Sequence, residues 1–172
     1  QMVREAKARG LNISAEVTPH HFTLTDAAVA GYNTNAKMNP PLRSDDDVAA
    51  VIEGIKDGTI DAIASDHAPH HINQKMLEFD RAPFGITGLE TAVGLALTRL
   101  QLPAGRIIEL MSINPQKIMK VKPWGLFEGS DADLTLLDLD RTWTFDVSQT
   151  RSKSRNSPFH RSEEHTSELQ SR

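Results

Sequence analysis

The sequence contains no cysteine. Disulfide bonds, thiolate nucleophiles and cysteine-based zinc fingers are therefore excluded. Aromatic residues are also scarce, at 5% of the 172 residues, with a single tyrosine. No apolar run reaches the roughly 18 residues that a transmembrane helix needs, and no signal peptide is visible, so we expect no membrane partner. The chain opens on Gln1, so we expect its natural start to be missing; a cytoplasmic enzyme or enzyme fragment is the favoured class.

A large excess of basic residues is lacking as well. Lysine and arginine together number 19 against 23 acidic residues, which gives a formal net charge of -4. Proteins that bind duplex nucleic acid neutralise phosphates with clustered basic side chains, so we expect no nucleic-acid partner. Hydrophobic residues make up 38% and charged residues 24%, as in ordinary globular proteins. The length leaves room for one average domain and part of a second.

Hydrophobic periodicity predicts helices and short strands in alternation. Residues 1–9 end a first helix, and the segment 11–17 reads as a strand of β-branched and small residues. A second helix is expected over 45–56, where apolar residues recur at helical spacing and Ser44 is the N-cap. Residues 60–65 then form a small buried strand.

Two more helices and a β-rich segment are expected downstream. Thr87–Glu90 has the capping-box pattern that opens a helix to about residue 100, and Asn114 followed by proline caps another. Residues 133–140 and 142–147 alternate as β-strands do. They mark the start of a β-rich domain, whereas the polar sequence after residue 148 lacks the apolar residues to complete a sheet.

The alternation indicates an α/β fold built of parallel strand–helix units. Two loops that follow the predicted strands, 18–44 and 66–87, hold five of the seven histidines. Loops at the carboxyl ends of parallel strands are where such folds build active sites. Two strands cannot close a barrel, so the chain is either a small open α/β domain or the end of something larger.

Asp66 is the first candidate site residue because it directly follows the second strand. A carboxylate there can bind a divalent metal or act as a general base. His70, four residues further, can offer a hydrogen bond or a positive charge to an anionic substrate. Residue types alone leave open an alternative in which Asp66 caps a turn and the histidines are solvated.

Asn39 is the second candidate, because two prolines after it stiffen the loop. Its carboxamide can pair with an amide edge of a substrate, although a plain polyproline turn before the helix is favoured on this string alone. His20 and His21 suggest a metal pair, but adjacent side chains on an extended segment point in opposite directions. Hydrogen bonding by His20 is therefore favoured over ligation.

The rest of the loop before residue 87 contains weaker candidates for site residues. His71 and residues 73–78 read as a mobile, solvated loop. Gly85, after Phe84, permits either a close backbone approach to a ligand or a tight turn.

Four strings together resemble the bacterial dihydroorotases of the amidohydrolase superfamily, in order and spacing. They are Glu-Val-Thr-Pro-His-His at 16–21, Lys-Met-Asn-Pro-Pro-Leu-Arg at 37–43, Asp-Ala-Ile-Ala-Ser-Asp-His-Ala-Pro-His at 61–70 and Ala-Pro-Phe-Gly at 82–85. Gly-Ser-Asp-Ala-Asp-Leu at 129–134 is similar to the segment where such chains return to a small β-domain. The resemblance covers residues 1 to about 159.

This resemblance implies the C-terminal part of a (β/α)8 TIM-type barrel over residues 1–122, comprising its last two strand–helix units. The start of a small β-domain would follow over 123–159. The implied activity is the zinc-dependent, reversible conversion of L-dihydroorotate to N-carbamoyl-L-aspartate in pyrimidine biosynthesis. Asp66 is implied as a zinc ligand and the catalytic proton carrier. The implied substrate-binding residues are Asn39, His70, Phe84 and Gly85.

The resemblance also implies what this chain lacks. The family's other metal ligands and a substrate-binding arginine belong upstream of Gln1, and His20 and His21 do not match them. Because a catalytic zinc needs about three protein ligands, we expect the 172-residue chain to be inactive on its own and marginal as a fold.

Two alternatives and an odd tail remain. The chain could belong to another cyclic amidohydrolase, such as an allantoinase or a dihydropyrimidinase, or to a non-catalytic dihydroorotase homologue that is a structural partner of aspartate carbamoyltransferase. A homodimer or a complex with that transferase is the assembly the resemblance leaves open. Residues 160–172 resemble a translated sequencing adapter, so we interpret them as non-native; a genuine hydrophilic tail is the alternative.

Overall fold

The computed structural model describes residues 1–122, 125–131, 133–161, 163–165 and 170–171. Its helices are α1 (Met2–Ala8), α2 (Asp45–Lys56), α3 (Ile72–Lys75), α4 (Ala92–Leu100), α5 (Ala104–Ile108) and α6 (Asn114–Met119). Its strands are β1 (Glu16–Val17), β2 (Ala62–Ile63), β3 (Thr135–Leu136), β4 (Thr142–Thr144), β5 (Glu163–His165) and β6 (Gln170–Ser171). None of the helices in this described part has the length and apolar character needed to cross a membrane.

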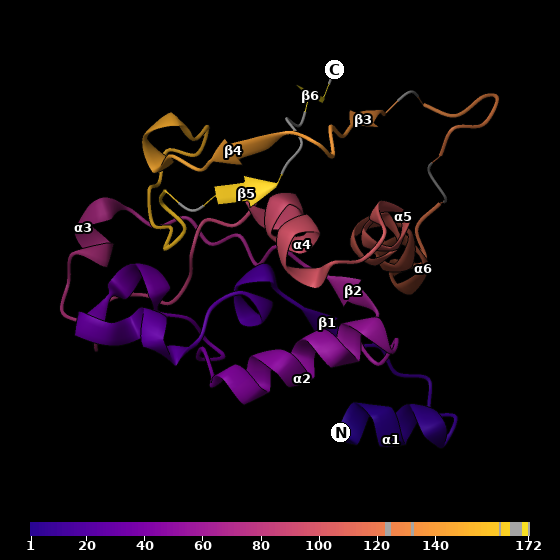
Figure 1. Cartoon of the computed structure of the whole chain (residues 1–172), viewed down its shortest axis with the longest axis horizontal. Helices are drawn as coiled ribbons and strands as arrows, with labels where there is room; N and C mark the ends of the chain where they lie inside the picture. The colour runs from indigo at the N-terminus through magenta and orange to yellow at the C-terminus, as the bar shows by residue number, and fades with distance from the viewer. Residues whose placement is uncertain (123–124, 132, 162, 166–169, 172) are drawn as a thin grey trace.

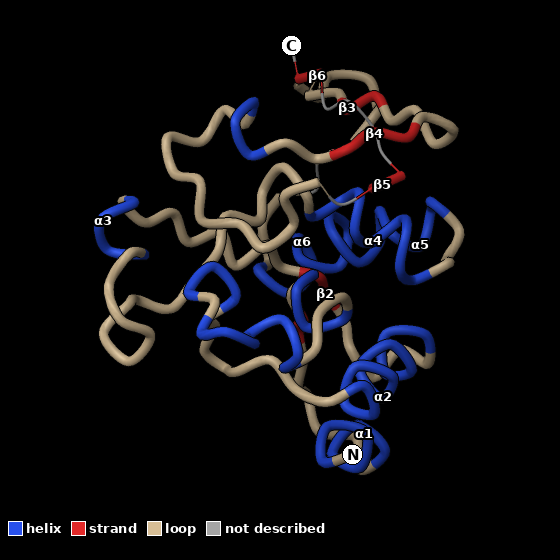
Figure 2. The backbone as a smooth tube through the Cα atoms, turned by 60° about the vertical axis from the view of Figure 1, so that its left-hand side comes forward, coloured by secondary structure: helices blue, strands red, loops and turns tan. Residues whose placement is uncertain are grey.

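The strands β1 and β2 form a parallel pair in the middle of the molecule. Glu16 pairs with Ala62 and Val17 with Ile63. The helix α2 lies on one side of this pair, and α4, α5 and α6 lie on the other (Figures 1 and 2). The predicted parallel strand–helix units are therefore confirmed, although both strands are shorter than the sequence suggested. Residues 11–15 lie outside the ladder, and Leu11 remains 49% exposed.

Among the described residues, the buried apolar side chains form one hydrophobic core between these layers. Ile55 of α2, Leu95 and Leu100 of α4, and the aromatic rings of Phe22 and Phe145 are all fully buried. Burial of one such side chain contributes roughly 1.5–3 kcal/mol, so the two helix layers are held mainly by apolar contact with the central strands. Ser44 caps α2 as predicted, because its hydroxyl accepts the N–H of Asp47.

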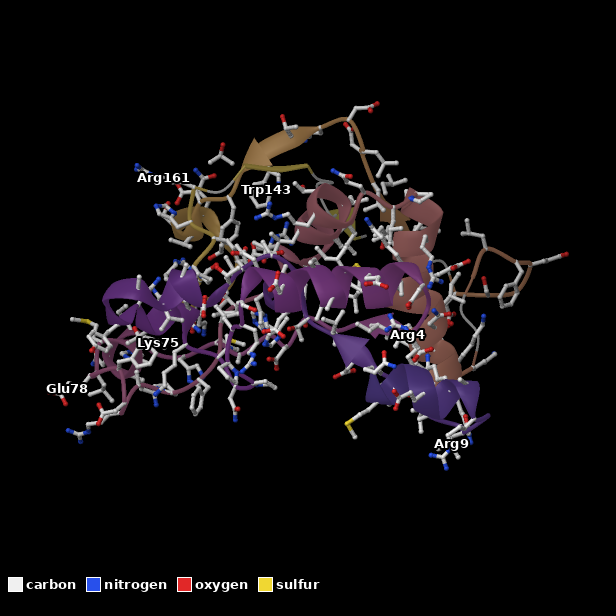
Figure 3. The ribbon with its side chains drawn as sticks, turned by 60° about the horizontal axis from the view of Figure 1, so that its bottom comes forward. Arg4, Arg9, Lys75, Glu78, Trp143 and Arg161 are labelled. Atoms are coloured by element: carbon white, nitrogen blue, oxygen red, sulfur yellow. The ribbon has the colours of Figure 1, made fainter. Side chains whose placement is uncertain are left out.

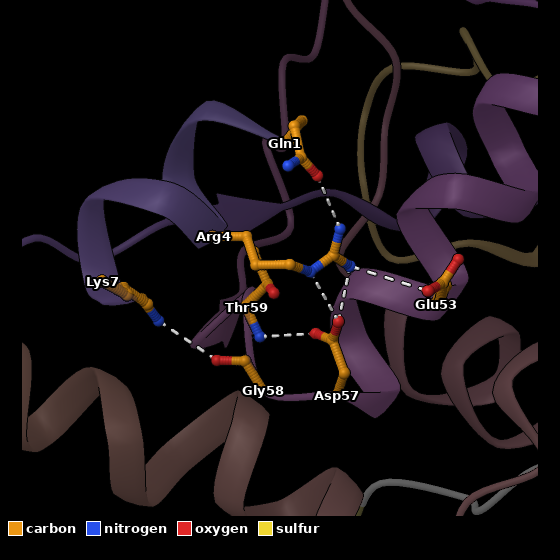
Figure 4. Close-up of polar contacts among 7 residues, drawn as sticks. All are labelled: Gln1, Arg4, Lys7, Glu53, Asp57, Gly58 and Thr59. Atoms are coloured by element: carbon orange, nitrogen blue, oxygen red, sulfur yellow. Dashed lines mark hydrogen bonds and ion pairs between the residues drawn. The ribbon is translucent and has the colours of Figure 1, made fainter. Parts of the chain in front are cut away.

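The helix α1 is attached by charged and polar contacts, since none of its residues is buried. Arg4 pairs with the carboxylate of Asp57 just after α2, and Lys7 Nζ donates to the carbonyl of Gly58 at 3.1 Å (Figure 4). Hydrogen bonds from Thr59, followed by those from Arg4, lower the pKa of Asp57 to about 2. The carboxylate is thus ionised at neutral pH and holds α1 against the end of α2.

The predicted start of the next helix was wrong. The helix α4 begins at Ala92, not at Thr87, and Thr87 donates its N–H to the carbonyl of Asn156. The carboxylate of Glu90 accepts the N–H of Arg151 instead of closing a capping box. The local pattern was misleading because both side chains serve a segment more than sixty residues downstream.

Asn114 does not cap a helix either. A π-helical turn, Glu109–Ile113, joins α5 to α6 without a break, so no free helix start exists there. The side-chain amide of Asn114 donates to the carbonyl of Asp61 at 2.9 Å. It therefore ties α6 to the residue just before β2.

The β-rich segment is built of short antiparallel pairs. The strand β4 pairs with β5, and β3 pairs with β6. Contrary to the expectation of an unpatterned polar stretch after residue 148, Asn156, Ser157 and Phe159 are buried. The boundaries at residues 122 and 159, and the non-native origin of residues 160–172, remain predictions.

Candidate active site

The carboxyl ends of β1 and β2 open into one pocket of about 490 Å³. Thr18 follows β1, Asp66 follows the second strand by three residues, and both line this pocket. Asn39, from the loop between β1 and α2, lines it as well. The full lining is Glu16, Val17, Thr18, His21, Asn39, Pro40, Arg43, Asp47, Val48, Val51, Ala64 and Asp66. Two of the candidate residues predicted from the sequence, Asn39 and Asp66, are thus brought together.

Asp66 adopts an uncommon backbone conformation at the end of its strand. Its φ is +47°, in the left-handed region that aspartate visits more readily than most residues. The side chain is 49% exposed, and its Oδ2 lies 3.9 Å from Nε2 of His20. The turn therefore leaves the carboxylate accessible from the pocket.

The extended-segment argument predicted that His20 and His21 point in opposite directions, and this prediction was wrong. They lie on a 3₁₀ turn, Pro19–Phe22, with ring centroids 4.4 Å apart. The hydroxyl of Thr18 lies 2.7 Å from both His20 Nε2 and His21 Nδ1. The hydrogen bonding that the sequence favoured for His20 is confirmed.

The directions of these hydrogen bonds follow from the atoms involved. His21 Nε2 donates to the carbonyl of Pro40 at 3.0 Å, so in a neutral His21 the Nδ1 atom accepts the Thr18 hydroxyl proton. The Thr18 oxygen then accepts the N–H of His20. Burial, followed by the neighbouring His21, lowers the pKa of His20 to about 3. The ring beside Asp66 is accordingly neutral at physiological pH.

His70, Phe84 and Gly85 form a second cluster, outside the lining of this pocket. His70 Nε2 donates to the carbonyl of Phe84 at 2.8 Å, and the N–H of Gly85 donates to the carbonyl of Lys37 at 2.9 Å. Gly85 has a φ of +121°, and a Cβ atom there would lie 2.5 Å from the Cβ of Ala68. The glycine is required because two loops cross at close range.

Two buried lysines hold the loop that carries Phe84 and Gly85, and no pattern in the sequence indicates them. Lys37 Nζ donates to the carbonyl of Ala82 at 2.6 Å, and Lys75 Nζ donates to the carbonyls of Pro83 at 2.9 Å and Gly85 at 3.1 Å. Burial, followed by the charge of Lys37, lowers the pKa of Lys75 to about 8. Figure 3 places Lys75 at the opposite end of the molecule from α1.

The prediction that His71 and residues 73–78 are solvated is confirmed for most of them, which are exposed, but Lys75 is an exception, and the mobility of this segment stays a prediction. His71 caps the short helix α3, and Gln74 completes the capping box. Lys75, the last residue of α3, is only 4% exposed. A charged residue at this position suggested solvent, because the sequence does not show the carbonyl groups that surround it.

The described residues do not form a complete metal site. Nowhere among them do three or more His, Asp or Glu side chains gather closely enough to hold a metal ion. Asp66 is a suitable oxygen ligand, but His20 and His21 are engaged by Thr18. Besides Asp66, the described lining of the pocket includes the carboxylates of Glu16 and Asp47, but these side chains do not gather into a metal site.

Solved structures with this arrangement define the class of protein. The L-hydantoinase (dihydropyrimidinase) of Arthrobacter aurescens superposes with a TM-score of 0.90 at 29% identity, over 99% of this chain and 40% of that chain. The dihydropyrimidinase of Brevibacillus agri superposes with a TM-score of 0.86 at 21% identity. This superposition covers 95% of this chain and 38% of the Brevibacillus agri chain. The fold is the TIM-barrel type of the cyclic amidohydrolases, of which this chain covers a part.

Residues 2–165 match the model of the Amidohydrolase family, and the chain belongs to that family. The dihydroorotases of Geobacter metallireducens and Pelotomaculum thermopropionicum are each 53% identical to it. Each alignment covers 92% of this chain but only 38% of the relative. The resemblance to bacterial dihydroorotases is confirmed, and the chain spans well under half the length of the relatives it matches. Membership of the family implies a metal ion.

Proposed function

We propose that this chain is the C-terminal part of a dihydroorotase. Residues 1–122 would supply the last two strand–helix units of its barrel, and residues 123–159 the start of its β-rich domain. The observation that carries the proposal is the pocket in which Asp66 and Asn39 meet at the carboxyl ends of two parallel strands. The 53% identity to dihydroorotases supports this substrate class over that of the less similar hydantoinases.

In this proposal Asp66 is the proton carrier of ring opening. Water adds to the ring carbonyl carbon of L-dihydroorotate while the carboxylate of Asp66 takes one of its protons. Asp66 then gives this proton to the ring nitrogen as the carbon–nitrogen bond breaks, which yields N-carbamoyl-L-aspartate. Its exposed carboxylate and the neutral ring of His20 beside it suit this role, because this imidazole adds no positive charge next to the base.

The remaining candidates would bind the substrate. The Asn39 carboxamide has one acceptor and two donors with which to pair an amide edge of the ring. His70, Phe84 and Gly85 belong to a cluster that is joined to the segment before Asn39, through the hydrogen bond from the Gly85 N–H to Lys37. We assign His70 to the substrate carboxylate, and the backbone at Phe84 and Gly85 to the ring.

The proposed metal is zinc, with Asp66 as one of its ligands. The described residues supply no complete ligand set, so the other ligands would come from the part of the enzyme that this chain does not span. For the same reason we expect the isolated 172-residue chain to show no turnover with added zinc.

A hybrid enzyme tests the proposal. Residues 2–159 would replace the matching segment of the Geobacter metallireducens dihydroorotase, and the purified hybrid would be assayed with L-dihydroorotate, dihydrouracil and allantoin. Turnover of L-dihydroorotate above the other two is the expected result. Preference for dihydrouracil or allantoin would assign the chain to another cyclic amidohydrolase. A folded hybrid without any turnover would favour the non-catalytic homologue, which would act as a structural partner of aspartate carbamoyltransferase.

A further inference from the structure

Asn156 lies in the stretch after β4 that the sequence left without a role, and it is 3% exposed. Its side chain reaches two loops. The Nδ2 atom donates to the carbonyl of Ala68 at 2.9 Å and to the carbonyl of Gly85 at 3.1 Å. The Oδ1 atom accepts the backbone N–H of His70 at 3.1 Å. One side chain therefore contacts the backbone on both sides of the His70–Phe84 hydrogen bond.

The backbone of Asn156 strengthens the same junction. Its carbonyl accepts the N–H of Thr87 at 2.9 Å. Beside it, the two loops already meet in a parallel bridge between His67 and Ile86, where the N–H of Ala68 donates to the carbonyl of Ile86 at 2.8 Å. Asn156 thus extends a short ladder that begins at His67, in the loop after β2.

The chemistry of this position selects asparagine. Two carbonyl oxygens require two N–H donors, and the N–H of His70 requires an acceptor, which is the pattern of one carboxamide. An aspartate of the same shape would place a buried carboxylate against two carbonyl oxygens with no proton to share. A serine would be too short to span the two loops.

We propose that Asn156 is a positioning residue for substrate binding. It fixes the backbone of His70 against that of Gly85, so that the His70 ring, Phe84 and Gly85 present one constant surface to the substrate. The inference rests on the proposed function for its substrate, but the junction itself is a property of this chain. Asn156 does not line the pocket of Asp66, so its loss weakens substrate affinity more than the chemical step.

Hydrogen exchange in the hybrid enzyme, in the absence of substrate, tests the junction without any catalysis. In Asn156→Asp, peptides covering residues 66–72 and 82–88 exchange faster than in the wild type, while peptides of α2 do not. Asn156→Ser repeats the loss without adding a charge, should the aspartate variant fail to fold. Ser157→Ala is the matched control, because that buried hydroxyl accepts only the nearby N–H of Phe159 in the contacts described. Unchanged exchange in the two loops of both Asn156 variants, or equal acceleration in α2, overturns the proposal.

Steady-state kinetics in the hybrid enzyme test the role of the junction. In the Asn156 variants, KM for L-dihydroorotate rises at least about fivefold while kcat stays within about twofold, and Ser157→Ala changes neither. A fall in kcat with an unchanged KM contradicts a role in binding. If the unmodified hybrid turns over no dihydroorotate, the proposed function fails, and the exchange experiment alone decides whether Asn156 positions the two loops.

Discussion

The hydroxyl oxygen of Thr18 lies 2.7 Å from Nε2 of His20, at the point where β1 ends. The same imidazole nitrogen lies 3.9 Å from the carboxylate of Asp66, which follows β2. One neutral ring therefore spans the ends of the two parallel strands. This contact links the fold to the candidate chemistry, because it places a buried, uncharged group beside the proposed proton carrier.

Removal of the Thr18 hydroxyl should destabilise the chain. In Thr18→Val, the rings of His20 and His21 both lose the hydroxyl group to which they are hydrogen-bonded. An unsatisfied buried nitrogen costs roughly 1–3 kcal/mol. Urea denaturation of the hybrid enzyme measures the loss. Thr25→Val is the control, because the Thr25 hydroxyl makes no capping bond to the turn that follows it. Equal destabilisation by the two variants would show that the Thr18 network contributes nothing particular.

Gly85 is predicted to tolerate no side chain. Gly85→Ala adds a methyl group 2.5 Å from the Cβ of Ala68, on top of the strain of a φ of +121°. We expect a loss of about 2–4 kcal/mol in the free energy of unfolding. Gly58→Ala, at a φ of +82° with open space around it, isolates the strain and should cost about 1–2 kcal/mol. The crossing of the two loops would be refuted by a Gly85→Ala variant as stable as Gly58→Ala.

The buried Lys75 predicts a particular dependence of stability on pH. Its pKa is lowered from 10.5 to about 8 in the folded chain, so between these values the unfolded chain binds more protons than the folded one. The free energy of unfolding of the wild type, relative to Lys75→Met, should therefore rise as the pH increases from 8 towards 10.5. Denaturation of both proteins at several pH values measures this difference. A difference that stays level or falls over that range would contradict the buried environment of Lys75.

The sequence predicted those parts of the fold that depend on contacts between residues close together in the chain. The helix α2 and its cap at Ser44 agree with the structure, because periodicity and capping are local properties. The meeting of Asp66 and Asn39 could also be predicted, since loops at the carboxyl ends of adjacent parallel strands share one edge.

The failures share a physical cause, which is contact between residues far apart in the chain. Thr87 and Glu90 have the pattern of a capping box, yet their partners lie in the segment around Asn156. Lys75 is a residue type that usually faces water, but the carbonyls of a folded-back loop surround it. No spacing rule in a single sequence identifies such partners, so the junction of the two loops became evident only in three dimensions.

The central claim is that Asp66 is the catalytic carboxylate of a dihydroorotase, and one measurement tests it most directly. The turnover of L-dihydroorotate would be compared in the hybrid enzyme with Asp66, with Asp66→Asn, and with Asp45→Asn, which alters an exposed carboxylate at the start of α2. We predict that Asp66→Asn lowers kcat at least about a hundredfold in a protein that remains folded, and that Asp45→Asn leaves kcat unchanged. An Asp66→Asn hybrid that retains the wild-type kcat would contradict the account.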